Sequence, residues 1–262
     1  MILSATKIKD FKGCKRLYYF KYVEGLTPKK DAEVLKDGRT YHEKIEEIYN
    51  QGYFTPSGDK TDAMAMAYEK YIYPKFKVKK DEDWFNYNVD DKLSLVGRYD
   101  GVTEDGLLVE HKTTSFDVDD EYMYNLQWDE QILCYMLSKG VNTMYYTVCK
   151  KPSIRQKVNE TDEEFIKRCC DWYDIDTESK ISVVKITRTH NDIQKFKVSL
   201  IDLADEIAEC EQKERYYCNP NHCNVYNRKC PYASICLNYN KEMNYVDFVK
   251  KEDKKEKKDE LF

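Results

Sequence analysis

Extended apolar segments are missing from this chain of 262 residues. No stretch approaches the roughly 20 consecutive apolar residues that a membrane-spanning helix needs, so we expect no membrane association. An export signal is missing as well, because Met1 to Thr6 has no charged start followed by an apolar segment. We therefore expect a cytoplasmic protein whose 10 cysteines are reduced and do not form a disulfide framework.

An excess of positive charge is also absent. The chain has 43 Lys and Arg residues against 48 Asp and Glu residues, which gives a formal net charge of −5. This balance argues against a protein that coats nucleic acid by bulk charge, although a local basic groove is compatible with it. With 41% hydrophobic residues and no internal repeat, the chain has the material for one elaborated folded domain.

Short β-type patterns occupy the middle of the chain. They cover about residues 84–89, 93–102 and 106–112, with Asp-Gly turns expected at 100–101 and 105–106. A helical pattern over about 121–138 and a strand pattern over 143–149 follow. This order predicts an α/β fold, a mixed sheet flanked by helices. The other patterns are helical at 33–49, 62–73, 163–173 and 193–215, and strand-like at 181–189.

Two carboxylates and a lysine fall at the facing ends of two of these strands. Glu110 and Lys112 are two residues apart, so they share one strand face while the side chain of His111 points to the other, and a short hairpin brings Asp100 beside them. Mg²⁺ or Mn²⁺ prefers oxygen ligands and keeps several waters, so Asp100, Glu110 and the backbone carbonyl of His111 suit an open metal site. A lysine beside such a metal points to phosphodiester hydrolysis. The alternative is a turn-capping Asp100 and a surface Glu110–Lys112 ion pair.

Further polar residues extend this set in a fixed order along the chain. His42 lies in a predicted helix before the strands, and Gln131 and Tyr135 lie one turn apart on the helix after them. This order resembles the PD-(D/E)XK nuclease superfamily, in particular its RecB-like branch, and implies a restriction-endonuclease-like fold. The resemblance implies His42, Asp100 and Glu110 as metal ligands, Lys112 as the catalytic lysine, and Gln131 and Tyr135 as supports of the site or contacts to the DNA backbone.

The cysteines divide into two sets. Five lie in predicted helices or strands, where small apolar residues are normal, and we expect them to pack in the core. They are Cys134, Cys149, Cys169, Cys170 and Cys210. The other five are Cys14 and, in a loop poor in apolar residues, Cys218, Cys223, Cys230 and Cys236. Four thiolates on one inorganic centre would order that loop, and the lack of a tight Cys-x-x-Cys pair favours an iron–sulfur cluster over zinc.

The spacing of the second set adds to the resemblance. Iron–sulfur members of the RecB-like branch, including the CRISPR-adaptation nucleases, take one cysteine from the N-terminal helical segment and three from a Cys-Pro-Tyr-type loop. Cys14 and the segment 230–236 match this pattern. The resemblance implies a 4Fe-4S cluster on Cys14, Cys223, Cys230 and Cys236. Cys218 is a rival to Cys223, although the Asn-Pro-Asn segment before Cys223 resembles phage-type exonucleases of this branch.

These interpretations combine into one expectation. A nuclease domain covers residues 1–245, with a helical region at 28–82, a catalytic sheet core at 83–150 and a cluster region of Cys14 with 218–236; a charged, flexible tail follows at 246–262. The expected activity is that of an Mg²⁺- or Mn²⁺-dependent exonuclease on single-stranded DNA or DNA ends. Helicase, recombination or CRISPR-adaptation proteins are candidate partners. The alternatives are a non-catalytic nucleic-acid-binding or assembly protein with the same fold, and a zinc-stabilised interaction module.

Overall fold

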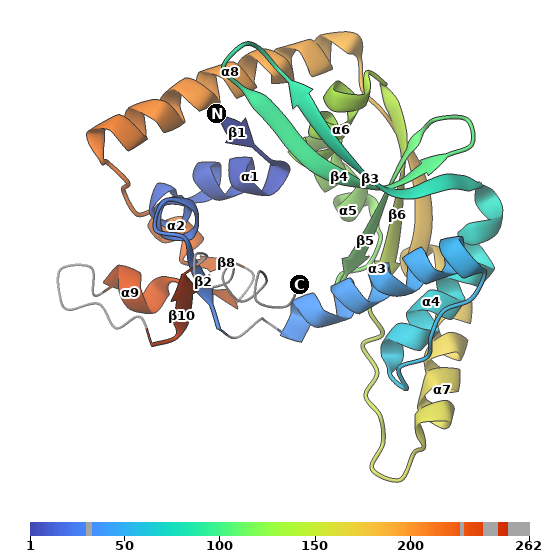
Figure 1. The fold of residues 1–262 in the computed structure, drawn as a ribbon. Coiled ribbons are helices and arrows are strands. Elements are labelled where there is room, and N and C mark those ends of the chain that lie inside the picture. Colours follow the sequence, from blue (N-terminus) through green and yellow to red (C-terminus); the bar gives the residue numbers. More distant parts are fainter. Residues whose placement is uncertain (30–32, 226–227, 238–245, 251–262) are drawn as a thin grey trace, which may run out of the picture. The chain divides into compact units, whose positions relative to one another are not determined.

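The computed structural model describes residues 1–29, 33–225, 228–237 and 246–250 (Figure 1). The chain divides into two compact units, one formed by Met1–Ala32 with Ser199–Phe262 and the other by Glu33–Val198. The single domain over residues 1–245 stays a prediction, and the predicted tail lies outside the described residues from residue 251 onward. Within the described parts, no helix is both long enough and apolar enough to cross a membrane.

A mixed sheet forms the centre of the unit Glu33–Val198. Its strands neighbour one another in the order β3-β4-β5-β6-β7. The neighbours are antiparallel except β5 and β6, which are parallel because a helical crossover returns the chain before β6 begins. The strands are β3 (Val78–Asn88), β4 (Ser94–Thr103), β5 (Leu108–Thr114), β6 (Thr143–Lys150) and β7 (Ile181–Thr187). The predicted α/β fold with a mixed sheet is confirmed.

Helices cover both faces of this sheet. Side chains alternate along β6, so Cys149 packs in a cluster with three helices of one face, whereas Tyr146 points to the other face and hydrogen-bonds Tyr122. The helices on the first face are α3 (Glu33–Gln51), α4 (Lys60–Tyr71) and α7 (Asp162–Asp174). Those on the second are α5 (Asp120–Asn125) and α6 (Glu130–Lys139). Short 3-10 turns lie at Tyr73–Lys75, Leu126–Trp128 and Thr177–Ser179.

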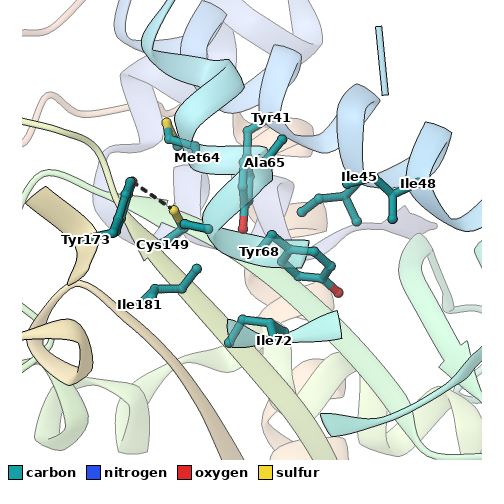
Figure 2. Close-up of a cluster of buried hydrophobic side chains, with 11 residues drawn as sticks. Tyr41, Ile45, Ile48, Met64, Ala65, Tyr68, Ile72, Cys149, Tyr173 and Ile181 are labelled. Atoms are coloured by element: carbon teal, nitrogen blue, oxygen red, sulfur yellow. Dashed lines mark hydrogen bonds between the residues drawn. The ribbon is translucent and has the colours of Figure 1, made fainter. Parts of the chain in front are cut away.

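The main apolar core of this unit lies on the first face. Figure 2 shows Tyr41 and Ile45 of α3 close to Tyr68 of α4, and Tyr173 of α7 beside Cys149 of β6. Tyr41 and Tyr68 meet edge to face with ring centroids 6.3 Å apart. Such edge-to-face contacts add to the stabilisation that burial of the aromatic rings provides. This core fixes α3 against the sheet, and α3 carries His42.

A buried ion pair joins α3 to α4 beside that core. The Lys44 ammonium lies 2.7 Å from an Asp62 carboxylate oxygen, and both side chains are almost fully buried. The Asp62 carboxylate also accepts backbone N–H groups of Ser57 at 2.9 Å and Gly58 at 2.8 Å. Burial raises the pKa of Asp62, but Lys44 and these N–H donors outweigh it, so the pKa is lower than usual. The charged form of Asp62 therefore stabilises the fold.

Replacing Asp62 with alanine should destabilise the protein by about 3 to 5 kcal/mol, because it leaves the buried Lys44 cation unpaired. The stabilisation by Asp62 is fully present above the usual Asp pKa of about 3.9 and is lost as the pH falls through the lower folded-state value. Urea unfolding at neutral and acidic pH measures both effects. Asp171→Ala, which removes the exposed Lys167–Asp171 pair, is the control and should change stability by less than about 1 kcal/mol. Equal losses in the two variants would contradict the prediction.

Two local expectations were wrong. The helix predicted over 121–138 is interrupted, because Asp129 has extended backbone angles and its carboxylate accepts the backbone N–H of Gln131 at 2.9 Å, which starts α6 afresh. The segment 100–101 is not a turn, because β4 continues through it to Thr103. The hairpin turns instead at Gly106, whose φ of +84° suits glycine.

The other unit joins the two ends of the chain. Its elements are β1 (Ile2–Leu3), α1 (Ala5–Gly13), α2 (Lys15–Tyr18), a π-helical turn at Tyr19–Val23, β2 (Leu26–Pro28), the later part of α8 (His190–Lys213), a 3-10 turn at Pro220–His222, β8 (Asn224–Val225), β9 (Arg228–Lys229), α9 (Ala233–Leu237) and β10 (Phe248–Lys250). Ser4 caps α1 by accepting the N–H of Lys7 at 3.3 Å. Tyr232 stacks between Phe20 and Phe248, so aromatic packing connects segments far apart in sequence.

Candidate active site

Strands β4 and β5 bring two carboxylates together in the unit Glu33–Val198. The register pairs Gly101 with Val109, which sets Asp100 beside Glu110. One Asp100 oxygen accepts the backbone N–H of His111 at 2.7 Å. This bond holds the carboxylate next to the point where the pairing of β4 with β5 ends. The Glu110 side chain is 2% exposed, whereas that of Asp100 is 15% exposed. The pair therefore has one buried carboxylate and one that solvent reaches.

Lys112 and α6 complete a hydrogen-bonded network around Glu110. The Lys112 ammonium forms an ion pair with Glu110 Oε1 and donates to Gln131 Oε1 at 2.8 Å. Gln131 Nε2 donates to Glu110 Oε1 at 2.9 Å and to the Tyr135 hydroxyl at 2.7 Å. The Tyr135 hydroxyl donates in turn to the backbone carbonyl of Arg98 at 2.8 Å. Gln131 therefore fixes both the carboxylate and the ammonium, and Tyr135 fixes Gln131 to β4.

Burial and charge act on this network in opposite directions. Burial raises the pKa of Glu110, and the Asp100 carboxylate raises it further. Burial by itself would lower the pKa of Lys112, but the Glu110 and Asp100 carboxylates outweigh it and raise the pKa above its usual value. Lys112 is therefore a fixed cation and not a proton acceptor at neutral pH. These surroundings disfavour the charged form of Glu110, which a bound cation in addition to Lys112 would stabilise.

His42 of α3 reaches the same place from the first face of the sheet. Its Nδ1 lies 3.7 Å from Asp100 Oδ1, and burial lowers the pKa of His42. A neutral imidazole is the form that binds a metal ion. The side chain of His111 points away, as the strand alternation predicts, and its Nδ1 lies 2.7 Å from the Thr147 hydroxyl. The ring of His111 packs edge to face on Tyr68 and so belongs to the core.

The donor set suits a hard divalent cation. Glu110 Oε2 is buried and has no hydrogen-bond partner among the described residues, so an acceptor oxygen is available beside Asp100. No three His, Cys, Asp or Glu side chains of the described ranges stand close enough together to enclose an ion. An Mg²⁺ or Mn²⁺ site that retains several waters does not need such an enclosure, because one or two carboxylates suffice. The residues therefore fit an open site.

The second set of cysteines lies together in the other unit. Cys14, Cys218, Cys223, Cys230 and Cys236 all line one cavity, whose wall also contains Phe20 and Tyr232. The sulfur atoms of Cys218 and Cys223 are 3.8 Å apart, and the Asn219 N–H donates to Cys14 Sγ at 3.3 Å. Burial raises the pKa of Cys223, Cys230 and Cys236. A positively charged centre would favour the thiolate forms of these three residues.

The first set of cysteines is in the core, as expected. Four of them are buried and Cys170 is half-buried. The sequence did not identify Asp129 as a site residue, although a carboxylate two residues before Gln131 at a helix start is an N-cap signal that would have found it.

Comparisons with known proteins give one family match over part of the chain and similarities to solved structures. The chain matches the PD-(D/E)XK nuclease superfamily over residues 2–86, a segment that contains Cys14 and His42 but ends before Asp100. An alkaline exonuclease from Laribacter hongkongensis is similar over 81% of this chain and 92% of its own, with 12% identity and a TM-score of 0.37. A phage-related exonuclease from Haemophilus somnus 129PT is similar over 76% and 91%, with 15% identity and a TM-score of 0.35. No curated protein sequence matches the chain significantly. The family match over residues 2–86 confirms the predicted resemblance to the superfamily for that segment.

Proposed function

We propose that this chain, which resembles the PD-(D/E)XK nuclease superfamily, is a divalent-metal-dependent deoxyribonuclease that acts as an exonuclease on single-stranded DNA or DNA ends. The observation that carries the proposal is the Glu110 carboxylate, which is buried beside Asp100 and Lys112 with one oxygen unpaired among the described residues. A buried carboxylate in this setting costs free energy unless a cation compensates it. The unpaired oxygen of Glu110, beside Asp100, is therefore a position that a bound metal ion would stabilise.

Each residue of the site has a distinct part in the proposal. Asp100, Glu110, His42 and the backbone carbonyl of His111 would hold Mg²⁺ or Mn²⁺. When bound, such an ion polarises a phosphoryl oxygen and lowers the pKa of a coordinated water. The Lys112 ammonium, fixed by Gln131, would stabilise negative charge that develops on the phosphate in the transition state.

The cysteine cavity supports a second part of the proposal, a structural 4Fe-4S cluster. Cys14, Cys223, Cys230 and Cys236 are the proposed ligands, and their common cavity connects the N-terminal helices to the C-terminal loop of the same unit. Cys218 lines the same cavity and stays an alternative to Cys223. Four thiolates on one centre would order a loop that has few apolar side chains of its own.

A cleavage assay on end-labelled DNA tests the activity. Purified protein is incubated with single-stranded, blunt and tailed duplex DNA in Mg²⁺, in Mn²⁺ and in excess chelator. We expect shortening from ends in either metal and none in chelator. DNA binding without cleavage in any metal would instead favour the non-catalytic nucleic-acid-binding alternative. Circular single-stranded DNA distinguishes exonuclease from endonuclease cleavage, because an exonuclease leaves it intact.

Helicase, recombination or CRISPR-adaptation partners stay predictions from the resemblance.

Tyr135→Phe should lower the turnover number by about 10- to 100-fold, because Tyr135 holds Gln131 and through it the metal-binding carboxylate. Tyr135 is a positioning residue, so the same variant should also bind Mn²⁺ more weakly in a titration without DNA. Tyr99→Phe is the matched control, since it keeps the ring that packs on Tyr135 and removes only a hydroxyl that bonds Ser138. Unchanged Mn²⁺ affinity in Tyr135→Phe would refute the positioning role.

A further inference from the structure

An exposed tryptophan lies on the β3–β4 ribbon, which Figure 1 shows as a long twisted pair of strands. Trp84 of β3 is 74% exposed, an unusual position for the largest apolar side chain. The register pairs it with Arg98 of β4, and the Arg98 guanidinium lies 5.6 Å from the centre of the Trp84 ring. Trp84 therefore presents a flat aromatic surface with a cation beside it.

The side of the ribbon that faces the core is filled by neighbours of Trp84 and not by Trp84 itself. Phe85 stacks on Tyr99 with ring centroids 4.7 Å apart, and a side chain at Gly97 would meet the Phe85 ring at 2.7 Å. Glycine at this position thus lets Phe85 lie flat against β4. Because strand side chains alternate, Trp84 points to the opposite side, where its ring adds little to the core. Packing in the core therefore does not explain why a tryptophan stands at position 84.

The outward side of the ribbon is suited to an anionic ligand. Over the register pairs from Trp84–Arg98 to Asn88–Ser94, the outward side chains include one cation and no carboxylate. The amide oxygen of Asn88 accepts the Ser94 hydroxyl at 3.0 Å, and Asn86 is exposed between Trp84 and Asn88 along β3. Aromatic, amide and guanidinium groups are those that stack on bases and bind phosphates.

This surface leads directly to the candidate active site. Arg98 is two residues before Asp100 on β4, a separation of about 7 Å along a strand. The backbone carbonyl of Arg98 also anchors Tyr135. Arg98 is therefore placed between the Trp84 ring and the carboxylates.

We propose that Trp84 and Arg98 form a subsite for single-stranded DNA, in which Trp84 stacks on a nucleobase and Arg98 contacts the adjoining phosphate next to the one cleaved. This inference rests on the proposed nuclease function and names the strand state of its substrate. A base in a duplex already stacks on its neighbours, so its face is not available to a protein ring. An unpaired base gains the stacking that it lacks, whatever its identity.

The test is binding of a fluorescein-labelled oligothymidylate in excess chelator, measured by anisotropy so that cleavage does not interfere. Trp84→Ala should weaken binding about 10-fold or more, Trp84→Phe should keep most of it, and Arg98→Ala should weaken it with a smaller salt dependence. Blunt duplex binding should change little in Trp84→Ala. The matched control is Tyr53→Ala, an exposed aromatic 11 residues beyond His42, which should bind as the wild type does.

A spectroscopic measurement keeps the proposal falsifiable if a variant folds poorly. The chain has three tryptophans, so Trp128→Phe with Trp172→Phe leaves Trp84 as the single reporter. Oligothymidylate should quench its fluorescence. Unchanged affinity in Trp84→Ala, an equal loss for the blunt duplex, or no quenching would overturn the subsite while metal-dependent cleavage by the wild type still stands. Absence of cleavage by the wild type would instead reject the nuclease function itself.

Discussion

Glu110→Ala is expected to reduce DNA cleavage by about 1,000-fold or more, with DNA binding in chelator nearly unchanged, because Glu110 acts on the metal and the transition state more than on the bound strand. Lys112→Ala should behave in the same way. Each removes a charge from a network in which Lys112, Glu110 and Gln131 fix one another. Turnover and affinity are measured separately, the first with Mg²⁺ or Mn²⁺ and the second without metal.

A carboxylate of the same hairpin provides the control for this experiment. Glu104 is exposed in the turn between β4 and β5, so Glu104→Ala should cleave at the wild-type rate. Glu110→Gln keeps the shape of the side chain and removes only its charge, which separates lost chemistry from lost packing. Full turnover in Glu110→Gln or in Lys112→Ala would refute the assignment of the site.

The second large effect concerns the cysteine cavity. Replacing Cys14, Cys230 or Cys236 singly with serine should give colourless protein in which the unit of Met1–Ala32 and Ser199–Phe262 is destabilised by several kcal/mol, because a metal centre that orders a loop contributes its binding energy to folding. Cys170→Ser should keep the brown colour that a 4Fe-4S cluster would give the protein, and should stay stable. Cys170 is half-buried like Cys230 but lies in α7, outside the cavity. Visible absorbance, iron content and thermal unfolding are the measurements.

The same series distinguishes the remaining ligand choices. Loss of colour in Cys223→Ser with a brown Cys218→Ser would support Cys223 as the fourth ligand, and the reverse result would assign Cys218. Stoichiometric zinc without iron in protein purified anaerobically would exclude the cluster and favour the zinc alternative. The cleavage site could be intact in that case, because it lies in the unit Glu33–Val198.

The sequence by itself determined the relations that depend on local geometry. Glu110 and Lys112 share a face because strand side chains alternate, and Gln131 and Tyr135 align because helical residues four apart do. The strands and most helices were predicted for the same reason. Apolar side chains recur about every two residues in a strand and every 3.6 residues in a helix, and both periods can be read from the sequence. The superfamily resemblance also rests on such local patterns in a fixed order.

Tertiary structure decided what depends on residues far apart in the chain. The continuation of β4 through Gly101 shows that a local turn signal yields to sheet register. Five thiols share one cavity because packing of the two chain ends brings Cys14 to the C-terminal loop. Local residue spacing does not determine a contact between segments so far apart in the sequence. Trp84 became a candidate for base stacking only when its partner across the ribbon was known to be Arg98, because cross-strand register is set by the whole sheet.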